Sequence, residues 1–316
     1  MTTDQMLLDT ADRIFADHCD KLMLDAAEVG DFPETLRSVL ADNGFFHLAM
    51  RDSGFALADA FAVLRVAGRH AAPVPLAEIM LANRWLEQAD EFATVGVSDG
   101  DTIANAPWAR AAKVVVGIAA NGGSAIVVRD GAVTEGANLA GESRDAVAVG
   151  DPAPLDCGDD ACFDLLALAR VAQTAGSLER VLELCLGYAN EREQFGRPIA
   201  KFQAVQHNLA ILAAEVAAAV RAADAAAAAL GDARQRVEIA VAKARVGEAA
   251  GVVAEIAHQV HGAMGFTHEH QLHHFTRRAW AWRDEFGNDV FWRRELGAHI
   301  AGVGAEGAWG FIATRG

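Results

Sequence analysis

The stretch NEREQFGRPIAKFQAVQHNLA, from Asn190 to Ala210, stands out in a chain that is otherwise rich in alanine and aliphatic residues. Its first half concentrates charged and amide side chains, a glycine and a proline between two long apolar patterns. Gly196 and Pro198 favour a sharp turn that presents backbone donors. Arg192 adds a planar guanidinium that suits a pyrophosphate. We therefore interpret this corner as a site that binds a phosphorylated cofactor.

Long helical patterns lie on both sides of this corner. Residues 161–191 predict one amphipathic helix, and a second is expected from Phe202 to Ala229, about 40 Å long at 1.5 Å per residue. A third helix follows from apolar residues three or four positions apart: Val237, Val241, Ala244, Val252, Ile256 and Val260. Helices of this length, crowded with alanine, indicate a bundle in which the helices approach closely.

The preceding sequence has two other patterns. Residues 1–91 show helical spacing, whereas residues 92–160 contain short β-branched runs with Asn-Gly and Asp-Gly steps at 121–122 and 130–131. Such steps between apolar runs are strong hairpin signals. The predicted fold is mainly α with a small β-domain: an N-terminal helical domain (1–91), a central β-domain (92–160) and a C-terminal four-helix bundle (161–316).

Composition restricts the possible partners and location. The balance of 27 Lys and Arg against 43 Asp and Glu gives a net charge of −16, which disfavours nucleic acid and anionic membranes as partners. The N-terminus lacks the pattern of a secretory signal, and no apolar run is long enough to span a bilayer. The four cysteines have neither metal-ligand nor disulfide spacing. These features predict a cytoplasmic protein with free thiols.

Six histidines crowd one segment: His258, His261, His268, His270, His273 and His274. His270 and His274 have the i,i+4 spacing that can chelate a metal on one helical face. However, the segment has no HExxH pattern and no nearby cysteine. We therefore predict core or interface histidines and no metal site.

Two segments resemble the signatures of the acyl-CoA dehydrogenase family: EREQFGRPIAKFQAVQHNLA (191–210) and QVHGAMGFTHEHQLHHFTRRA (259–279). The helix–strand–helix order of the whole chain also agrees with that family. The resemblance implies FAD as the cofactor, often lodged in a neighbouring subunit. It assigns the FAD contacts to Arg192, Gln194, Phe195, Gln203, Gln259, Gly262 and Gly265. Ala263 departs from the family, because a second glycine is usual there.

The resemblance also implies a reaction. Family members oxidise the Cα–Cβ bond of an acyl-CoA thioester: a carboxylate removes the α-proton, hydride passes to the flavin, and electron-transfer flavoprotein is the expected acceptor. Alignment of the terminal helix places Glu285 at the position of the base, with Asp284 as the second candidate. Nearby aromatic residues would raise the pKa of such a carboxylate. Alternatively, Asp284 and Glu285 are helix N-terminal acids that the helix dipole favours.

One expected family element is missing. The β-domain lacks the Thr-Glu-Pro-small-Gly-Ser-Asp segment and the tryptophan-containing strand that cradle the flavin ring, although Trp108 is present nearby. A chain that has the FAD-contacting motifs but lacks the segments around the flavin ring resembles the short subunit of heteromeric, steroid-catabolic acyl-CoA dehydrogenases. In those enzymes the active site is assembled from two unlike chains. A hetero-oligomer is therefore expected, with a homo-oligomer as the alternative.

Three functions follow from the resemblance. The first is FAD-dependent α,β-dehydrogenation of an acyl-CoA in lipid or steroid catabolism, with this chain as one subunit. The second is a non-catalytic partner that completes the FAD site of another chain. The third is a relative that uses flavin and oxygen on a substrate other than a thioester.

Overall fold

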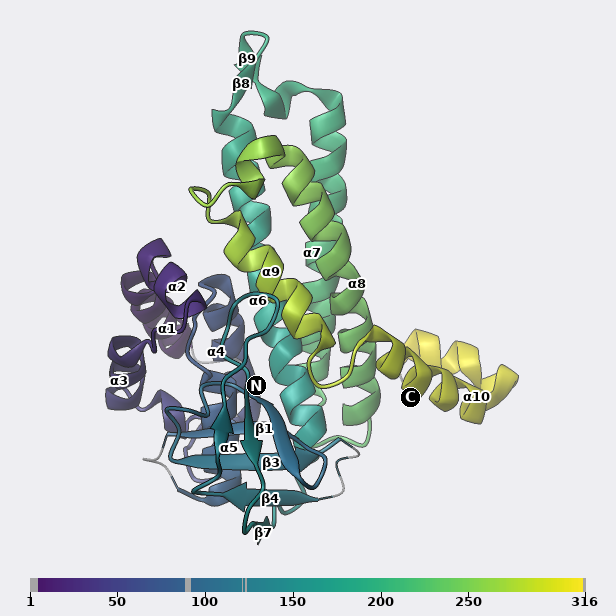
Figure 1. Ribbon diagram of the computed structural model, residues 1–316. Helices are drawn as coiled ribbons and strands as arrows, with labels where there is room; N and C mark the ends of the chain where they lie inside the picture. The colour runs from purple at the N-terminus through teal and green to yellow at the C-terminus, as the bar shows by residue number, and fades with distance from the viewer. Residues whose placement is uncertain (1–4, 89–91, 121, 123, 315–316) are drawn as a thin grey trace. The chain divides into compact units, whose positions relative to one another are not determined.

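The computed structural model describes residues 5–88, 92–120, 122 and 124–314, coloured along the chain in Figure 1. Backbone contacts divide the chain into two compact units, Met1–Ala169 and Arg170–Gly316. The three-domain division expected from the sequence is not tested by this split and stays a prediction. Among the described residues, no helix has the length and apolar character needed to cross a membrane.

The first unit begins with short helices. They are α1 (Gln5–His18), α2 (Lys21–Glu28), α3 (Glu34–Asp42), the 3-10 turn η1 (Phe45–His47), α4 (Leu57–Arg69) and α5 (Leu76–Leu86). α5 is buried over most of its length because it packs on the first strand of the sheet.

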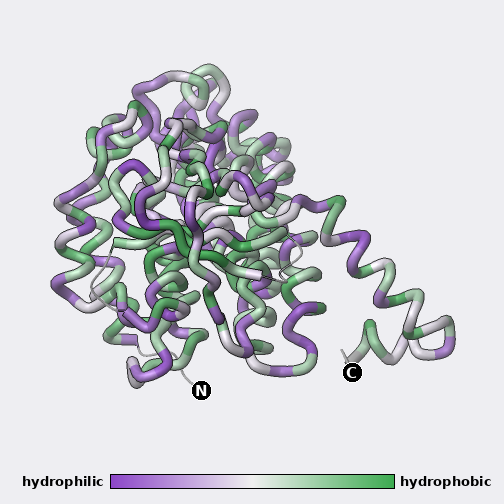
Figure 2. Tube along the Cα trace, turned by 60° about the horizontal axis from the view of Figure 1, so that its bottom comes forward, coloured by the Kyte–Doolittle hydropathy of each residue, from purple (hydrophilic) through white to green (hydrophobic). Residues whose placement is uncertain are grey.

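A seven-stranded mixed sheet follows. Its strands are β1 (Ala93–Ser98), β2 (Thr102–Ala106), β3 (Val114–Ala119), β4 (Ala125–Val128), β5 (Val133–Thr134), β6 (Asp145–Ala148) and β7 (Ala153–Leu155). Their order is β5-β6-β2-β1-β3-β4-β7, with β1 and β3 parallel and the other neighbours antiparallel. The apolar side chains of Ile103, Val115 and Val147 pack in the core of this sheet. Figure 2 shows the hydrophobic stretches of the chain in green.

The sheet confirms one predicted strand pair and corrects another. β3 and β4 pair as expected, although Asn121 of their predicted turn lies outside the described residues. The hairpin expected at Asp130-Gly131 is wrong, because β5 pairs with β6 rather than with β4. A Cβ atom on Gly131 would lie 2.5 Å from a methyl carbon of Val147, so the glycine allows the chain to pass close against β6.

The second unit is helical. Its elements are α6 (Cys162–Glu191, from Arg170 onward), β8 (Glu193–Gln194), β9 (Arg197–Pro198), η2 (Ile199–Lys201), α7 (Gln203–Ala228), α8 (Gln235–His261), η3 (Gly262–Phe266), α9 (Leu272–Asp284) and α10 (Asp289–Thr314). α7 packs along α8 through small buried residues such as Ala219 and Ala226. Ser177 of α6 donates a hydrogen bond to the carbonyl oxygen of Phe275 in α9 at 3.1 Å. The predicted mainly α fold with a C-terminal helical bundle is confirmed.

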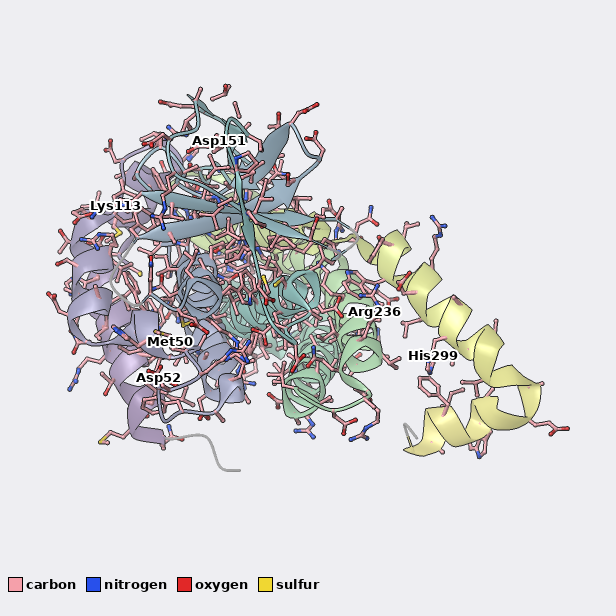
Figure 3. The ribbon with its side chains drawn as sticks, turned by 90° about the horizontal axis from the view of Figure 1, so that it is seen from below. Met50, Asp52, Lys113, Asp151, Arg236 and His299 are labelled. Atoms are coloured by element: carbon pink, nitrogen blue, oxygen red, sulfur yellow. The ribbon has the colours of Figure 1, made fainter. Side chains whose placement is uncertain are left out.

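α10 leaves the bundle and bends at Gly304, whose φ is 78°. At its start, Arg236 of α8 pairs with Glu295 at 2.7 Å. Beyond the bend, the ring of Phe311 lies 5.0 Å from that of His299, so the second half of the helix folds back on the first. Figure 3 labels Arg236 near the start of α10 and His299 along it.

Candidate functional site

The charged corner of the sequence forms a two-residue β-hairpin that projects from one end of the helical bundle (Figure 1). Glu193 and Gln194 of β8 pair with Pro198 and Arg197 of β9. Phe195 and Gly196 form the turn with φ values of 52° and 77°. Positive φ at both central residues is the geometry of a tight hairpin turn, and glycine adopts it at the least cost.

The residues of the first motif are accessible to a ligand. Arg192, Gln194 and Gln203 are exposed, and the side chain of Phe195 is 92% exposed. Among the described residues, no group forms a hydrogen bond or an ion pair with the guanidinium of Arg192. The neighbouring guanidinium of Arg197 instead lies over the ring of Phe202, 4.3 Å from its centre. Arg192, unlike Arg197, is therefore available for an anion.

The second motif begins in the last turn of α8 and continues beyond its C-terminus. Gln259 and Gly262 are exposed, and Gly262 caps the helix with a φ of 57°. No atom lies within 4 Å of a Cβ built on Gly262, so its backbone can be approached closely. Gly265 has a different role: an added Cβ would lie 3.0 Å from the Cβ of His261. Gly265 is thus fixed by packing, whereas Gly262 stays open to a ligand.

A single aromatic contact brings the two motifs to the same end of the bundle. Tyr188, one turn before Arg192 in α6, stacks on His261 with ring centres 4.5 Å apart. The ring of His270 lies 6.2 Å from Tyr188 and 4.6 Å from His261. Because His261 directly precedes Gly262, this stack joins the hairpin to the cap of α8.

The histidines beside this stack act as packing groups. Burial lowers the pKa of His258, His261 and His270, so their neutral forms dominate near pH 7. His261 Nδ1 lies 2.8 Å from the carbonyl oxygen of Ala257, and His258 Nε2 lies 3.0 Å from Thr276 Oγ1. These hydrogen bonds fix the ring orientations against the helices.

Apolar side chains are also exposed in the two motifs. Phe195 is 92% exposed, Phe266 74% and Met264 43%, although one face of Phe266 stacks on His258. Large apolar groups that gather at one place usually mark a surface that another molecule covers. This end of the bundle therefore combines a free cation, open backbone and uncovered aromatic rings.

The predicted base lies elsewhere, at the end of α9. Glu285 Oε2 accepts a hydrogen bond from Arg170 Nε at 2.5 Å. The arginine side chain is 2% exposed and that of the glutamate 14%. Arg170 is held in turn by the side-chain oxygen of Gln173 at 2.7 Å and lies over the ring of Phe286. The Glu285 carboxylate is thus one half of a largely buried ion pair.

A buried lysine completes this cluster. Lys243 Nζ donates to the carbonyl oxygens of Arg283 at 3.0 Å and Glu285 at 2.7 Å. Burial lowers the pKa of Lys243 to about 7. The alternative that Asp284 and Glu285 are helix N-terminal acids is wrong, because α9 ends at Asp284. The dipole disfavours acids at a C-terminus, and Lys243 and Arg170 compensate for it.

The expected aromatic surround is present, but it encloses cations as well. The side chains of Trp282, Phe286 and Trp292 are buried. Trp292 Nε1 donates a hydrogen bond to the carbonyl oxygen of Phe286 at 3.0 Å. Asp284, the second candidate for the base, is exposed. Neither cation belongs to the site predicted from the sequence. A lone arginine at position 170 and a lone lysine at 243, each in a strongly apolar helical stretch, are the signals that would have indicated them.

Trp108 of the first unit has a structural role. Its side chain is 2% exposed, its indole nitrogen donates to the carbonyl oxygen of Pro73 at 3.0 Å, and its ring meets that of Phe32 edge-on. Trp108 is therefore part of the core and presents no surface to a flavin ring.

Comparisons with known proteins agree with these observations. Residues 160–300 match the family described as the C-terminal domain of acyl-CoA dehydrogenases. The chain is 31% identical over 301 residues to acyl-CoA dehydrogenase IpdE2 of Mycobacterium tuberculosis, covering 87% of this chain and 90% of that protein.

Solved structures share the fold over nearly the whole chain. One is the ChsE4–ChsE5 complex from Mycobacterium tuberculosis, with a TM-score of 0.85, 24% identity and coverage of 96% of this chain and 99% of that chain. Another is a variant of the Tcur3481–Tcur3483 steroid acyl-CoA dehydrogenase, with a TM-score of 0.81, 25% identity and coverage of 94% and 97%. The chain belongs to the acyl-CoA dehydrogenase family of flavin-dependent oxidoreductases.

Proposed function

We propose that this chain is one subunit of a heteromeric, FAD-dependent acyl-CoA dehydrogenase and completes the FAD site of a second acyl-CoA dehydrogenase chain. The main observation behind the proposal is that the Tyr188–His261 stack brings both motifs to the same end of the bundle. At that end, the guanidinium of Arg192 has no partner among the described residues.

The residues present fit the phosphate and adenosine parts of FAD. Arg192 would bind the pyrophosphate in a bidentate manner, as its planar fork allows. The open backbone at Gly262 and the amide of Gln259 would lie along the same ligand, and the exposed ring of Phe195 would cover an apolar part of it. Bound FAD would supply the hydride acceptor for oxidation of the acyl Cα–Cβ bond.

Two observations support a heteromer over a homo-oligomer. Trp108 is buried in the core, so this tryptophan does not supply the flavin-ring contact expected from the family. Two of the similar structures are named as pairs of chains, ChsE4–ChsE5 and Tcur3481–Tcur3483, and the second is described as a steroid acyl-CoA dehydrogenase. We therefore propose a steroid-derived or other lipid acyl-CoA as substrate, and electron-transfer flavoprotein as acceptor.

The surroundings of Glu285 favour a non-catalytic role for this chain. A general base needs a carboxylate oxygen directed at the substrate proton. Glu285 instead pairs with Arg170 at 2.5 Å, and its backbone oxygen binds Lys243. Removal of a substrate proton by Glu285 would require this pair to open. We propose that Glu285 holds the end of α9 and that the second chain supplies the base.

Turnover of the assembled complex tests this assignment. The complex is assayed with an acyl-CoA substrate and an artificial electron acceptor under anaerobic conditions. We expect Glu285→Gln to retain most activity and substitution of the partner's base to abolish it. If Glu285→Gln alone abolishes turnover while the complex stays assembled and yellow, Glu285 is the base. Activity that depends on air would instead identify a flavin enzyme that uses oxygen.

A further inference from the structure

Helix α10 carries apolar side chains that the described part of the chain leaves uncovered. Within that part, no residue after Trp292 is buried. We call residues 293–303 of this helix the first arm and residues 305–313 the second arm, because they lie on either side of its bend. On the second arm, Trp309 is 75% exposed and Ile312 59%. Large apolar side chains that gather on a surface mark a place that another molecule covers.

The two arms form a defined helical hairpin. The chain turns at Gly304, and the ring of Phe311 on the second arm lies 5.0 Å from that of His299 on the first (Figure 3). A Cβ atom on Gly307 would lie 2.7 Å from a methyl carbon of Val303, so the glycine lets the chain pack closely just after the bend. The exposed groups therefore belong to a fixed surface, which we call the α10 hairpin (293–313).

Charge is nearly absent from most of the α10 hairpin. Glu306 is the only aspartate, glutamate, lysine or arginine between Leu296 and Ala313. The whole chain carries a net charge of −16, so two copies of it repel each other in general. A nearly uncharged surface lets two copies approach with little local repulsion. The sequence of the hairpin thus favours a second copy of this chain as the molecule that covers it.

Two charges of opposite sign stand at corresponding places on the two arms. Arg294 lies at the start of the first arm and Glu306 at the start of the second, and both are exposed. Neither has a hydrogen-bond or ion-pair partner among the described residues. Four residues after Arg294, the exposed Ala298 lies on the same helical face, and three residues after Glu306 comes Trp309. A small residue therefore follows the cation, and a large one follows the anion.

We propose that the α10 hairpin binds the α10 hairpin of a second copy of this chain about a two-fold axis. The axis inverts the second copy, so the second arm of each copy lies along the first arm of the other. Arg294 of each copy then pairs with Glu306 of the other, and each Trp309 packs over the other copy's Ala298. No residue of either FAD motif takes part, so this contact is independent of the proposed FAD site. Together with the proposed heteromer, it gives an assembly with two copies of each chain.

The mass of the protein in solution tests the proposal. Sedimentation velocity is measured over a range of concentrations for the full chain and for its complex with the second chain. We expect a dimer of the full chain, and Trp309→Ser should halve the mass of both samples while the complex keeps its flavin. Leu22→Ser is the matched control, because Leu22 on α2 is 78% exposed and should leave the mass unchanged. A full chain that stays monomeric, or a mass that Trp309→Ser does not alter, would overturn the proposal.

Charge reversal identifies the partner. Arg294→Glu or Glu306→Arg alone should raise the dissociation constant of the dimer about tenfold or more, because each reversal places like charges together twice. The double variant should restore the original dissociation constant, since every pair is then reversed on both sides. A double variant that binds as weakly as the single variants would overturn the proposal. So would separation of the two unlike chains by Trp309→Ser, because the second chain would then be what covers the hairpin.

Discussion

Tyr188 and His261 stack with ring centres 4.5 Å apart, and this contact joins the end of α6 to the end of α8. Tyr188 is the only tyrosine in the chain. The residues that follow it form the exposed hairpin, and those that follow His261 form the exposed cap at Gly262. The stack therefore sets the spacing between two segments that we propose bind one FAD molecule.

Replacement of Tyr188 by alanine should separate these segments. Loss of an aromatic pair and its packing costs about 1–2 kcal/mol, and we expect a lower melting temperature together with weaker FAD binding in the assembled complex. Tyr188→Phe keeps the ring and serves as the matched control. Thermal unfolding and FAD titration of both variants check the prediction. Unchanged FAD affinity in Tyr188→Ala would show that the stack does not position the motifs.

Replacement of Arg192 by alanine should weaken FAD binding by about tenfold or more, because a charge-assisted bidentate contact to a phosphate is worth more than a neutral hydrogen bond. The fold should be unaffected, since the side chain is exposed. Arg221→Ala is the control, because that arginine side chain on α7 is 80% exposed and pairs with Asp224, three residues away. Equal FAD affinity in both variants would exclude Arg192 from the site.

The histidines around the Tyr188–His261 stack predict a loss of stability in mild acid. Burial lowers the folded-state pKa of His258, His261 and His270 below the ordinary 6.5, so the unfolded chain binds protons first as the pH falls. Their contribution is fully present above pH 6.5 and is lost progressively below that value. Urea unfolding between pH 5 and about 8 measures this dependence. His261→Gln should reduce its slope, and an identical slope would contradict the assignment.

The lowered pKa of Lys243 predicts that the free energy of unfolding depends on pH in the alkaline range. Its folded-state pKa is about 7 against an ordinary value of 10.5, so between these values the unfolded chain holds a proton that the folded chain has released. Stability should therefore rise with pH from about 7 toward 10.5, by up to about 1.4 kcal/mol per pH unit. Lys243→Met removes this titration. Urea unfolding curves of the two proteins from pH 7 to about 9 should diverge, and parallel curves would contradict the prediction.

The regular elements of this chain could be predicted because their signals are local. Apolar spacing of three and four residues located α6, α7 and α8, and the turn residues located the corner at Gly196. The error at Asp130-Gly131 shows the limit of such signals. A hairpin step indicates a turn, but the partner of β5 is decided by close packing of Gly131 against β6.

The surroundings of Glu285 could not be predicted for the same reason. Arg170 lies 115 residues from Glu285 in the sequence, and Lys243 lies 42 residues away, yet both bind it. Aromatic residues near Glu285 in the sequence indicated an apolar pocket, but the two cations come from other helices. Only the packing of α6, α8 and α9 shows that the carboxylate is paired.

A visible absorption spectrum can show whether this chain binds FAD alone or only together with a second chain. The chain is purified alone, then after co-expression with a second acyl-CoA dehydrogenase chain, and the flavin bands are compared. We expect a colourless lone chain and a yellow complex, with less bound flavin when the complex carries Arg192→Ala. Flavin bound stoichiometrically by the lone chain, or a yellow complex that is indifferent to Arg192, would contradict the claim that this chain completes the FAD site of another.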